Sequence, residues 1–136
     1  ASPITGSGYN LTVGGAGATT INSSINTGSG SLNVTGSGLV TLNGNNSFTG
    51  ATLVSSGSTL VIGATGNLSS QSVNVSSGGT LTTNGNVTLA GTSSLNGTIN
   101  GAGTLTVASG ATLGGNSSLT NTLIVNGSLA PGNSLG

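Results

Sequence analysis

Hydroxyl groups are the most frequent reactive side chains in this chain of 136 residues, and Tyr9 is the only side chain with an ordinary ionisable group. Serine and threonine need a neighbouring base to become nucleophiles, and a phenol titrates only at about pH 10. The sequence contains no Asp, Glu, Lys, Arg, His or Cys. Because no side chain can shuttle a proton near neutral pH, the sequence predicts that the protein is not an enzyme.

The missing residue types also bear on ligands. Zinc and transition metals are bound by imidazole, thiolate or carboxylate groups, and calcium sites rely on carboxylates. Nucleic acids are bound by Lys, Arg and aromatic side chains, whereas this chain offers only Tyr9 and Phe48. The longest apolar runs, such as residues 59–62, are far shorter than the roughly 18 residues of a membrane span. We therefore expect no metal, cofactor, small-molecule substrate, nucleic acid or membrane span.

Short stretches with apolar residues at alternate positions recur along the whole chain. Such alternation buries one face of a strand and exposes the other. Glycine and Asn-Gly corners separate the stretches, and no helical pattern occurs between them. A flexible Gly/Ser/Thr/Asn-rich linker is the alternative, although it would have no reason to keep the alternation. The stretches lie at residues 11–13, 32–34, 40–42, 60–62, 73–75, 87–89 and 105–107.

A longer period overlies these stretches. Leu11, Leu32, Leu53 and Val73 follow one another at nearly constant intervals, and we expect them to stack in one column. The segment 54–60 recurs at 75–81 and again at 107–113, and we interpret the second, longer interval as about one and a half coils. Repeats of this length are typical of stacked β-coils. A β-sandwich, in which turns recur at much shorter intervals, is the competing fold.

Two motifs resemble the autotransporter-associated β-strand repeat of bacterial surface passengers. Residues 36–63 follow its pattern, including the corner Asn46-Ser47-Phe48-Thr49-Gly50, and residues 128–134 match a second passenger signature, Ser-Leu-Ala-Pro-Gly-Asn-Ser. The resemblance implies a right-handed parallel β-helix that is secreted across the bacterial envelope and has no enzymatic role in the repeat. The fold class expected is therefore all-β, a β-solenoid of about six to seven coils with roughly 20–21 residues per coil.

The sequence departs from that family in two ways. It lacks the family's C-terminal membrane β-barrel, and its repeats carry none of the usual Asp and Lys residues. We accordingly expect either a passenger fragment or a small protein built wholly from repeats. Within it we expect one solenoid domain over residues 1–136, with an N-terminal coil region at 1–30, regular coils at 31–126 and a C-terminal tail or end coil at 127–136.

The two ends of the predicted solenoid are its candidate functional surfaces. Exposed strand edges are usually blunted by charges or caps, and the sequence shows neither device. Pro3 and Pro131 are expected at the two ends, where a missing N–H breaks no interior ladder, and Phe48 is expected to pack in a corner. The apolar and aromatic residues predicted to form the assembly ends are Ile4, Tyr9, Leu11, Val13, Val125, Leu129 and Leu135.

These expectations lead to a structural function. A formal net charge of zero favours association, and contact between unlike ends generates an open filament. We expect a secreted protein whose partner is itself and which forms an extracellular filament, sheath or matrix at a bacterial surface; the start Ala1-Ser2-Pro3 resembles a signal-peptide cleavage product.

Two other functions remain as alternatives. One is a spacer or adhesive passenger segment of a larger autotransporter. The other, more remote, is ice binding through outward threonines in the pairs Thr80/Thr82 and Thr104/Thr106.

Overall fold

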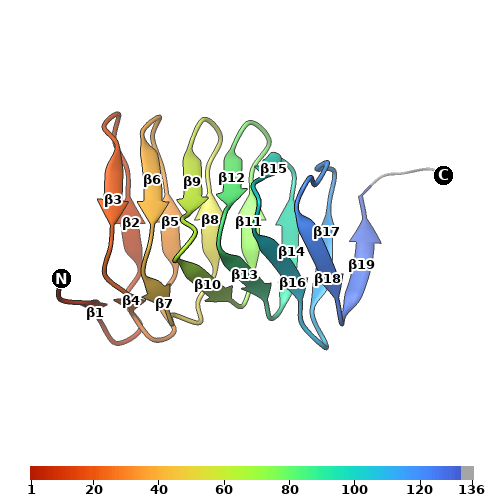
Figure 1. The fold of residues 1–136 in the computed structure, drawn as a ribbon, viewed down its shortest axis with the longest axis horizontal. Coiled ribbons are helices and arrows are strands. Elements are labelled where there is room, and N and C mark those ends of the chain that lie inside the picture. The colour runs from red at the N-terminus through yellow and green to blue at the C-terminus, as the bar shows by residue number, and fades with distance from the viewer. Residues whose placement is uncertain (133–136) are drawn as a thin grey trace.

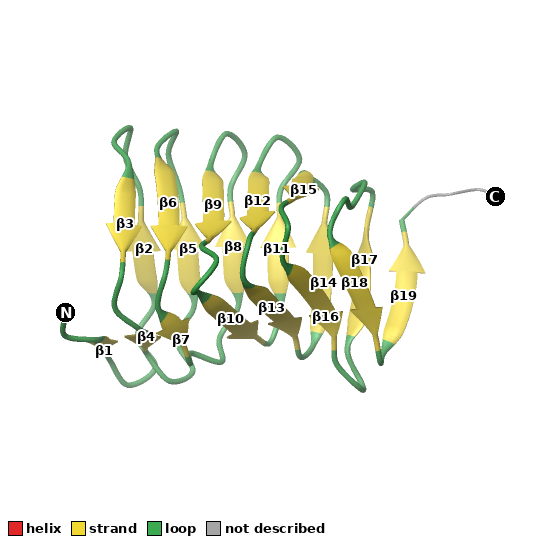
Figure 2. Cartoon of the chain, viewed as in Figure 1, coloured by secondary structure: helices red, strands yellow, loops and turns green. Residues whose placement is uncertain are grey.

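The chain is a single column of stacked β-coils. The computed structural model describes residues 1–132, and in these residues every regular element is a short strand (Figures 1 and 2). The strands are β1 (Ile4–Thr5), β2 (Leu11–Val13), β3 (Thr19–Ile21), β4 (Ile25–Asn26), β5 (Leu32–Val34), β6 (Leu39–Leu42), β7 (Asn45–Asn46), β8 (Thr52–Val54), β9 (Thr59–Ile62), β10 (Asn67–Ser70), β11 (Val73–Val75), β12 (Thr80–Thr83), β13 (Asn86–Leu89), β14 (Thr92–Leu95), β15 (Thr98–Asn100), β16 (Thr104–Val107), β17 (Thr112–Gly115), β18 (Thr122–Val125) and β19 (Ser128–Pro131).

The strands form three faces, and the chain visits these faces in a fixed order. Face 1 contains β7, β10, β13, β16 and β18, and the pair β1–β4 extends it toward the N-terminus through a hydrogen bond from the Ser47 N–H to the Ile25 carbonyl (3.0 Å). Face 2 runs from β2 to β19 through β5, β8, β11, β14 and β17. Face 3 contains β3, β6, β9, β12 and β15. All the strand pairs are parallel. The predicted fold, a parallel β-solenoid of about six turns, is confirmed.

The column predicted from the leucine spacing is wrong at one position. On face 2, Leu11 pairs with Leu32, Leu32 with Thr52, and Thr52 with Val73. The step between partners on adjacent coils, counted in residues, is shorter from Leu32 to Thr52 than on either side of it. Leu53 points outward and is 38% exposed, whereas Thr52 is fully buried. Alternation requires Thr52 and Val54 to share the inward face, and the Thr52 hydroxyl is accommodated by a hydrogen bond to the Ser70 hydroxyl (3.3 Å).

Several coils toward the C-terminus are shorter than the N-terminal coils. The step from Leu81 to its partner Ile99 is shorter than the step from Leu11 to Leu32, and the step from Leu113 to Leu129 is shorter still. The predicted coil length therefore holds for the N-terminal coils and again for the step from Thr92 to Thr112, but not for these two steps. The segments 54–60 and 75–81 both turn from face 2 to face 3, while 107–113 turns from face 1 to face 2. The interval between the last two copies is thus one and two-thirds coils, and one corner sequence serves two different corners.

The recurring corner is held by a tight backbone turn. In all three copies a glycine at positive φ, namely Gly57, Gly78 and Gly110, precedes a residue whose N–H binds the carbonyl three positions earlier. Glycine adopts this conformation without the steric cost that a Cβ would add. Because the turn is closed by a local hydrogen bond, similar seven-residue segments can change the chain's direction at two different corners of the column.

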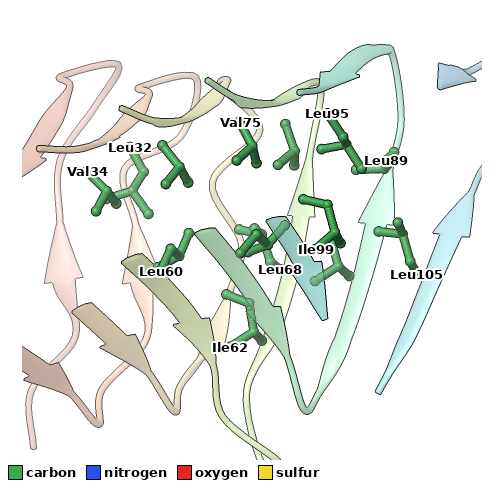
Figure 3. Packing of buried hydrophobic residues seen from close by; sticks show 14 of the residues in the cluster. Leu32, Val34, Leu60, Ile62, Leu68, Val75, Leu89, Leu95, Ile99 and Leu105 are labelled. Carbon is green, nitrogen blue, oxygen red and sulfur yellow. The ribbon is translucent and has the colours of Figure 1, made fainter. Parts of the chain in front are cut away.

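Columns of Val, Leu and Ile fill the interior. Figure 3 shows side chains from all three faces pointing into the same space, among them Leu32, Leu60 and Leu68, which are at most 1% exposed. Phe48 lies in the corner between β7 and β8 and is buried, as predicted. Dry contact between like columns stabilises each coil on its neighbours and needs no charged group.

Buried amides and hydroxyls complete the interior. Asn46 is 3% exposed; its Oδ1 accepts a hydrogen bond from the Ile25 N–H (3.0 Å), and its Nδ2 donates to the carbonyls of Gly44 (3.0 Å) and Asn67 (2.8 Å). Outside the core, the Asn43 Nδ2 donates to the Asn22 Oδ1 (2.8 Å) one coil away. Side-chain hydrogen bonds of this kind join coils in place of ion pairs.

Candidate assembly ends

Two ends of the column carry strands that are paired on one edge only. At the N-terminal end, β1, β2 and β3 pair with β4, β5 and β6 and have no described strand on the other side. At the C-terminal end, β18 and β19 pair with β16 and β17 alone. In Figure 1 these strands lie at opposite ends of the long axis, with the red N-terminal strands at one end and the blue C-terminal strands at the other.

Four predicted end residues lie at the N-terminal end. Ile4, Leu11 and Val13 are half-buried and pack against the core from one side only. Tyr9 lies in the corner between β1 and β2 and is 76% exposed. Ile21 on β3 was not among the predicted end residues and is half-buried in the same way. Its alternation with Thr19 would have identified it, but the run Ala-Thr-Thr-Ile is too polar to stand out as a strand.

The C-terminal end holds two of the three remaining predicted residues. Val125 on β18 and Leu129 on β19 are 40% and 49% exposed, and Leu135 lies outside the described residues. Three apolar residues at this end were not predicted: Leu119, Leu123 and the outward-facing Ile124. Leu123 could have been found, because it alternates with Val125.

An apolar hollow opens at the C-terminal end. Within residues 1–132, face 3 has no full strand beyond β15, and its next position is occupied only by Leu119, which forms an isolated bridge to Ile99. The missing strand leaves a hollow of about 190 Å³ beside Leu119. The hollow is lined by Leu95, Leu113, Gly114, Gly115, Ser117, Leu119, Leu123, Leu129 and Pro131.

The unpaired backbone N–H and C=O groups at one end of the described column are complementary to those at the other end. In each coil the inward residues direct their N–H and C=O groups to the following coil: the Leu11 N–H binds the Ser31 carbonyl (2.8 Å), and the Val13 carbonyl accepts the Thr35 N–H (2.9 Å). Outward residues therefore bind the preceding coil. By this alternation the open N-terminal edge offers the groups of Thr12, and the open C-terminal edge offers those of Leu123, Val125 and Leu129.

The C-terminal end carries the proline that was expected there, and this proline limits strand addition without a charge or a cap. Pro131 occupies an inward position on β19, opposite Gly115, so its nitrogen points toward the open edge. Proline has no N–H to donate there. The β19 edge consequently offers one donor fewer than the β18 edge, and this difference between the two C-terminal strands could not be read from the sequence without the register.

The chemistry available at both ends is dry contact and backbone hydrogen bonding. No side chain of the protein carries a formal charge, and no helix long and apolar enough to cross a membrane occurs in residues 1–132. Comparisons with known protein families, curated proteins and solved structures found no match to this chain.

Proposed function

We propose that this protein is a secreted structural protein that self-assembles head-to-tail into an extracellular filament, sheath or matrix. One observation carries the proposal: both ends of the column expose uncharged strand edges and apolar columns that are complementary to each other. An edge of this kind is a template for another β-strand. Contact between unlike ends leaves a free end after every addition, and so gives an open chain of subunits.

Apolar surface supplies the driving force for this assembly. Leu11 and Val13 at one end, and Leu123 and Leu129 at the other, belong to interior columns that simply stop where the described strands stop. Stacking a second copy would remove these side chains from water and extend each column. No like-charge repulsion opposes contact, because neither end carries a charged side chain.

A location outside the cell is supported by the resemblance to bacterial surface passengers. The corner Asn46-Ser47-Phe48-Thr49-Gly50, on which that resemblance rests, packs its Asn and Phe side chains into the core. The absence of charge also favours a material that must last in varied surroundings, because there are no ion pairs for salt to screen.

A spacer or adhesive segment within a longer autotransporter passenger is the second candidate function. Pro131 favours it, because natural solenoids use proline to limit strand addition at an edge. The step from Leu113 to Leu129 is also shorter than the step from Leu11 to Leu32, so the two end coils are not identical in outline.

Electron microscopy of the purified protein tests the proposal. We expect unbranched threads in dilute buffer, and the same threads in molar salt. A Leu129→Lys variant places a charge on the apolar column at the end and should remain monomeric. The matched control is Ala130→Lys, which adds the same charge to the neighbouring outward position of β19 and should still form threads.

Two results would contradict the filament. Discrete particles of the unmodified chain at high concentration would favour the spacer function. Equal loss of threads in both lysine variants would show that net charge, rather than contact at the end of the column, controls association.

A further inference from the structure

In a head-to-tail filament, each subunit can be rotated about the column axis relative to the subunit before it. The described ends favour one such rotation. Resting on the proposed head-to-tail assembly, we propose that each copy is turned by one third of a turn relative to the copy before it, so that β1 of the new copy lies on face 3, β2 on β18 and β3 on β19. The joint then continues the path of the coil instead of repeating the same face.

The order in which the chain visits the faces favours this rotation. The path runs from face 1 to face 2 to face 3, and the last described strand, β19, lies on face 2. The next position along the path is face 3, which is where the C-terminal end lacks a described strand and the hollow opens. Placing β1 there sets Ile4 of the second copy over Leu119 and covers the hollow with an apolar side chain.

A second argument comes from the backbone edges. β18 and β19 both have four residues. Every residue of β18 has a backbone N–H, whereas β19 lacks one at Pro131. In the rotated joint, β18 meets β2, a three-residue strand; in the unrotated joint it would meet β1, which has only two residues. The rotated joint therefore matches the intact edge with the longer partner. It allows the Leu123 carbonyl to accept the N–H of Thr12, and the Val125 N–H to donate to the carbonyl of Thr12.

Apolar contacts give the third argument. With β2 on β18, Leu11 lies over Leu123 and Val13 over Val125, and both pairs are of the kind found in the interior columns. In the unrotated joint Val125 would lie over Gly6, because the register places Gly6 and Val125 at the same inward position of face 1. Rotation thus covers an exposed valine that the unrotated joint leaves without an apolar neighbour.

A shift by one face also occurs within the protein, between two copies of its corner sequence. The corner sequence at 75–81 turns from face 2 to face 3, and its copy at 107–113 turns from face 1 to face 2. One corner sequence thus fits two different corners of the column. A subunit that advances by one face, about 30 Å tall at roughly 4.8 Å per coil, gives a filament that repeats after three subunits before any added twist.

Paired cysteine variants test the rotation, and the chain contains no natural cysteine to interfere. Thr12→Cys is combined with one of three partners. Ile124→Cys is its neighbour in the rotated joint, and Ala130→Cys is its neighbour in the unrotated joint. Thr120→Cys is its neighbour in the third possible joint, in which β2 lies on face 3. All four positions are exposed, and Thr12 is about six coils from the others, too far for a bond within one copy. Each variant is assembled under reducing conditions, checked for threads and then oxidised.

We expect T12C/I124C to give a ladder of covalent multimers on a denaturing, non-reducing gel, and the other two pairs to remain mainly monomeric. A dominant ladder from T12C/A130C or T12C/T120C, or threads without a ladder from any pair, would overturn the rotated joint and leave the filament function standing. Failure of the unmodified chain to form threads would remove both. Helical reconstruction of the threads gives an independent reading of the rotation per subunit.

Discussion

Asn46 shows at the residue scale how a solenoid without charge satisfies its buried polar groups. Its side chain accepts from the Ile25 N–H one coil earlier and donates to the Asn67 carbonyl one coil later and to the Gly44 carbonyl in its own coil. Replacing it by Ala leaves a buried donor unpaired, so we expect Asn46→Ala to lower the free energy of unfolding by about 2 to 3 kcal/mol. Urea unfolding measures this loss.

The control for that experiment is Ser47→Ala. The Ser47 hydroxyl donates to the Asn26 Oδ1 (2.7 Å) at an exposed position, and its removal should cost less than about 1 kcal/mol because water replaces the bond. Equal losses from the two variants would show that the amide of Asn46 has no special part in joining the coils.

Asn126 is expected to be the first of the five Asn-Gly sites to deamidate. Asn43, Asn84, Asn96 and Asn100 have side chains held by hydrogen bonds to neighbouring groups, and no such bond is found for Asn126 within residues 1–132. Deamidation requires the side-chain carbonyl carbon to reach the next backbone nitrogen, which a held amide resists. Peptide mass spectrometry after prolonged incubation at mildly alkaline pH measures the order. Deamidation at Asn43 or Asn84 before Asn126 would contradict it.

At the scale of the element, the register of β8 is the feature most open to test. Thr52 faces the core and Leu53 faces the solvent, although a hydrophobicity pattern favours the reverse. Thr52→Asp should lower the free energy of unfolding by about 3 kcal/mol or more at neutral pH, since it buries an unpaired charge. Leu53→Asp should cost less than about 1 kcal/mol.

The pH dependence of these two variants separates burial from a general effect of charge. Burial raises the pKa of a carboxyl above its unfolded value, so the folded Thr52→Asp variant binds its proton more tightly than the unfolded chain does. Its stability should therefore increase as the pH falls, while that of Leu53→Asp should change little. A strong and equal loss in both variants would place Leu53 in the interior and contradict the pairing of Thr52 with Val73.

For the whole molecule, the absence of titratable side chains predicts a flat pH profile. With no Asp, Glu, His, Lys or Cys, the folded and unfolded chains bind the same number of side-chain protons between about pH 5 and pH 9, so side chains add no slope to stability against pH. We expect the free energy of unfolding to vary by less than about 0.5 kcal/mol over this range, measured with urea below the concentration at which threads form. A sloping profile would mean that the terminal groups contribute to stability.

Composition and alternation alone showed which side-chain types are absent and which strand residues face inward. The missing charged residues predict that there is no side-chain catalysis, and this stays a prediction. The alternation at residues 32–34 and 60–62 identified inward residues, because consecutive strand residues point to opposite sides. The near-constant spacing of such stretches was enough to predict a parallel solenoid, because each coil must cover the open face of the one before it.

Which residues stack, and how the two ends are shaped, became known from the folded chain. Coil length depends on the length of each corner, and a corner can gain or lose a residue without disturbing the alternation within strands. For this reason Thr52 occupies the inward position that the residue spacing predicted for Leu53. The same freedom shortened the last coils, left face 3 without a described strand beside Leu119 and turned the nitrogen of Pro131 toward the open edge. Local sequence fixes which side of a strand is inward, but the register between distant coils comes from packing all three faces together.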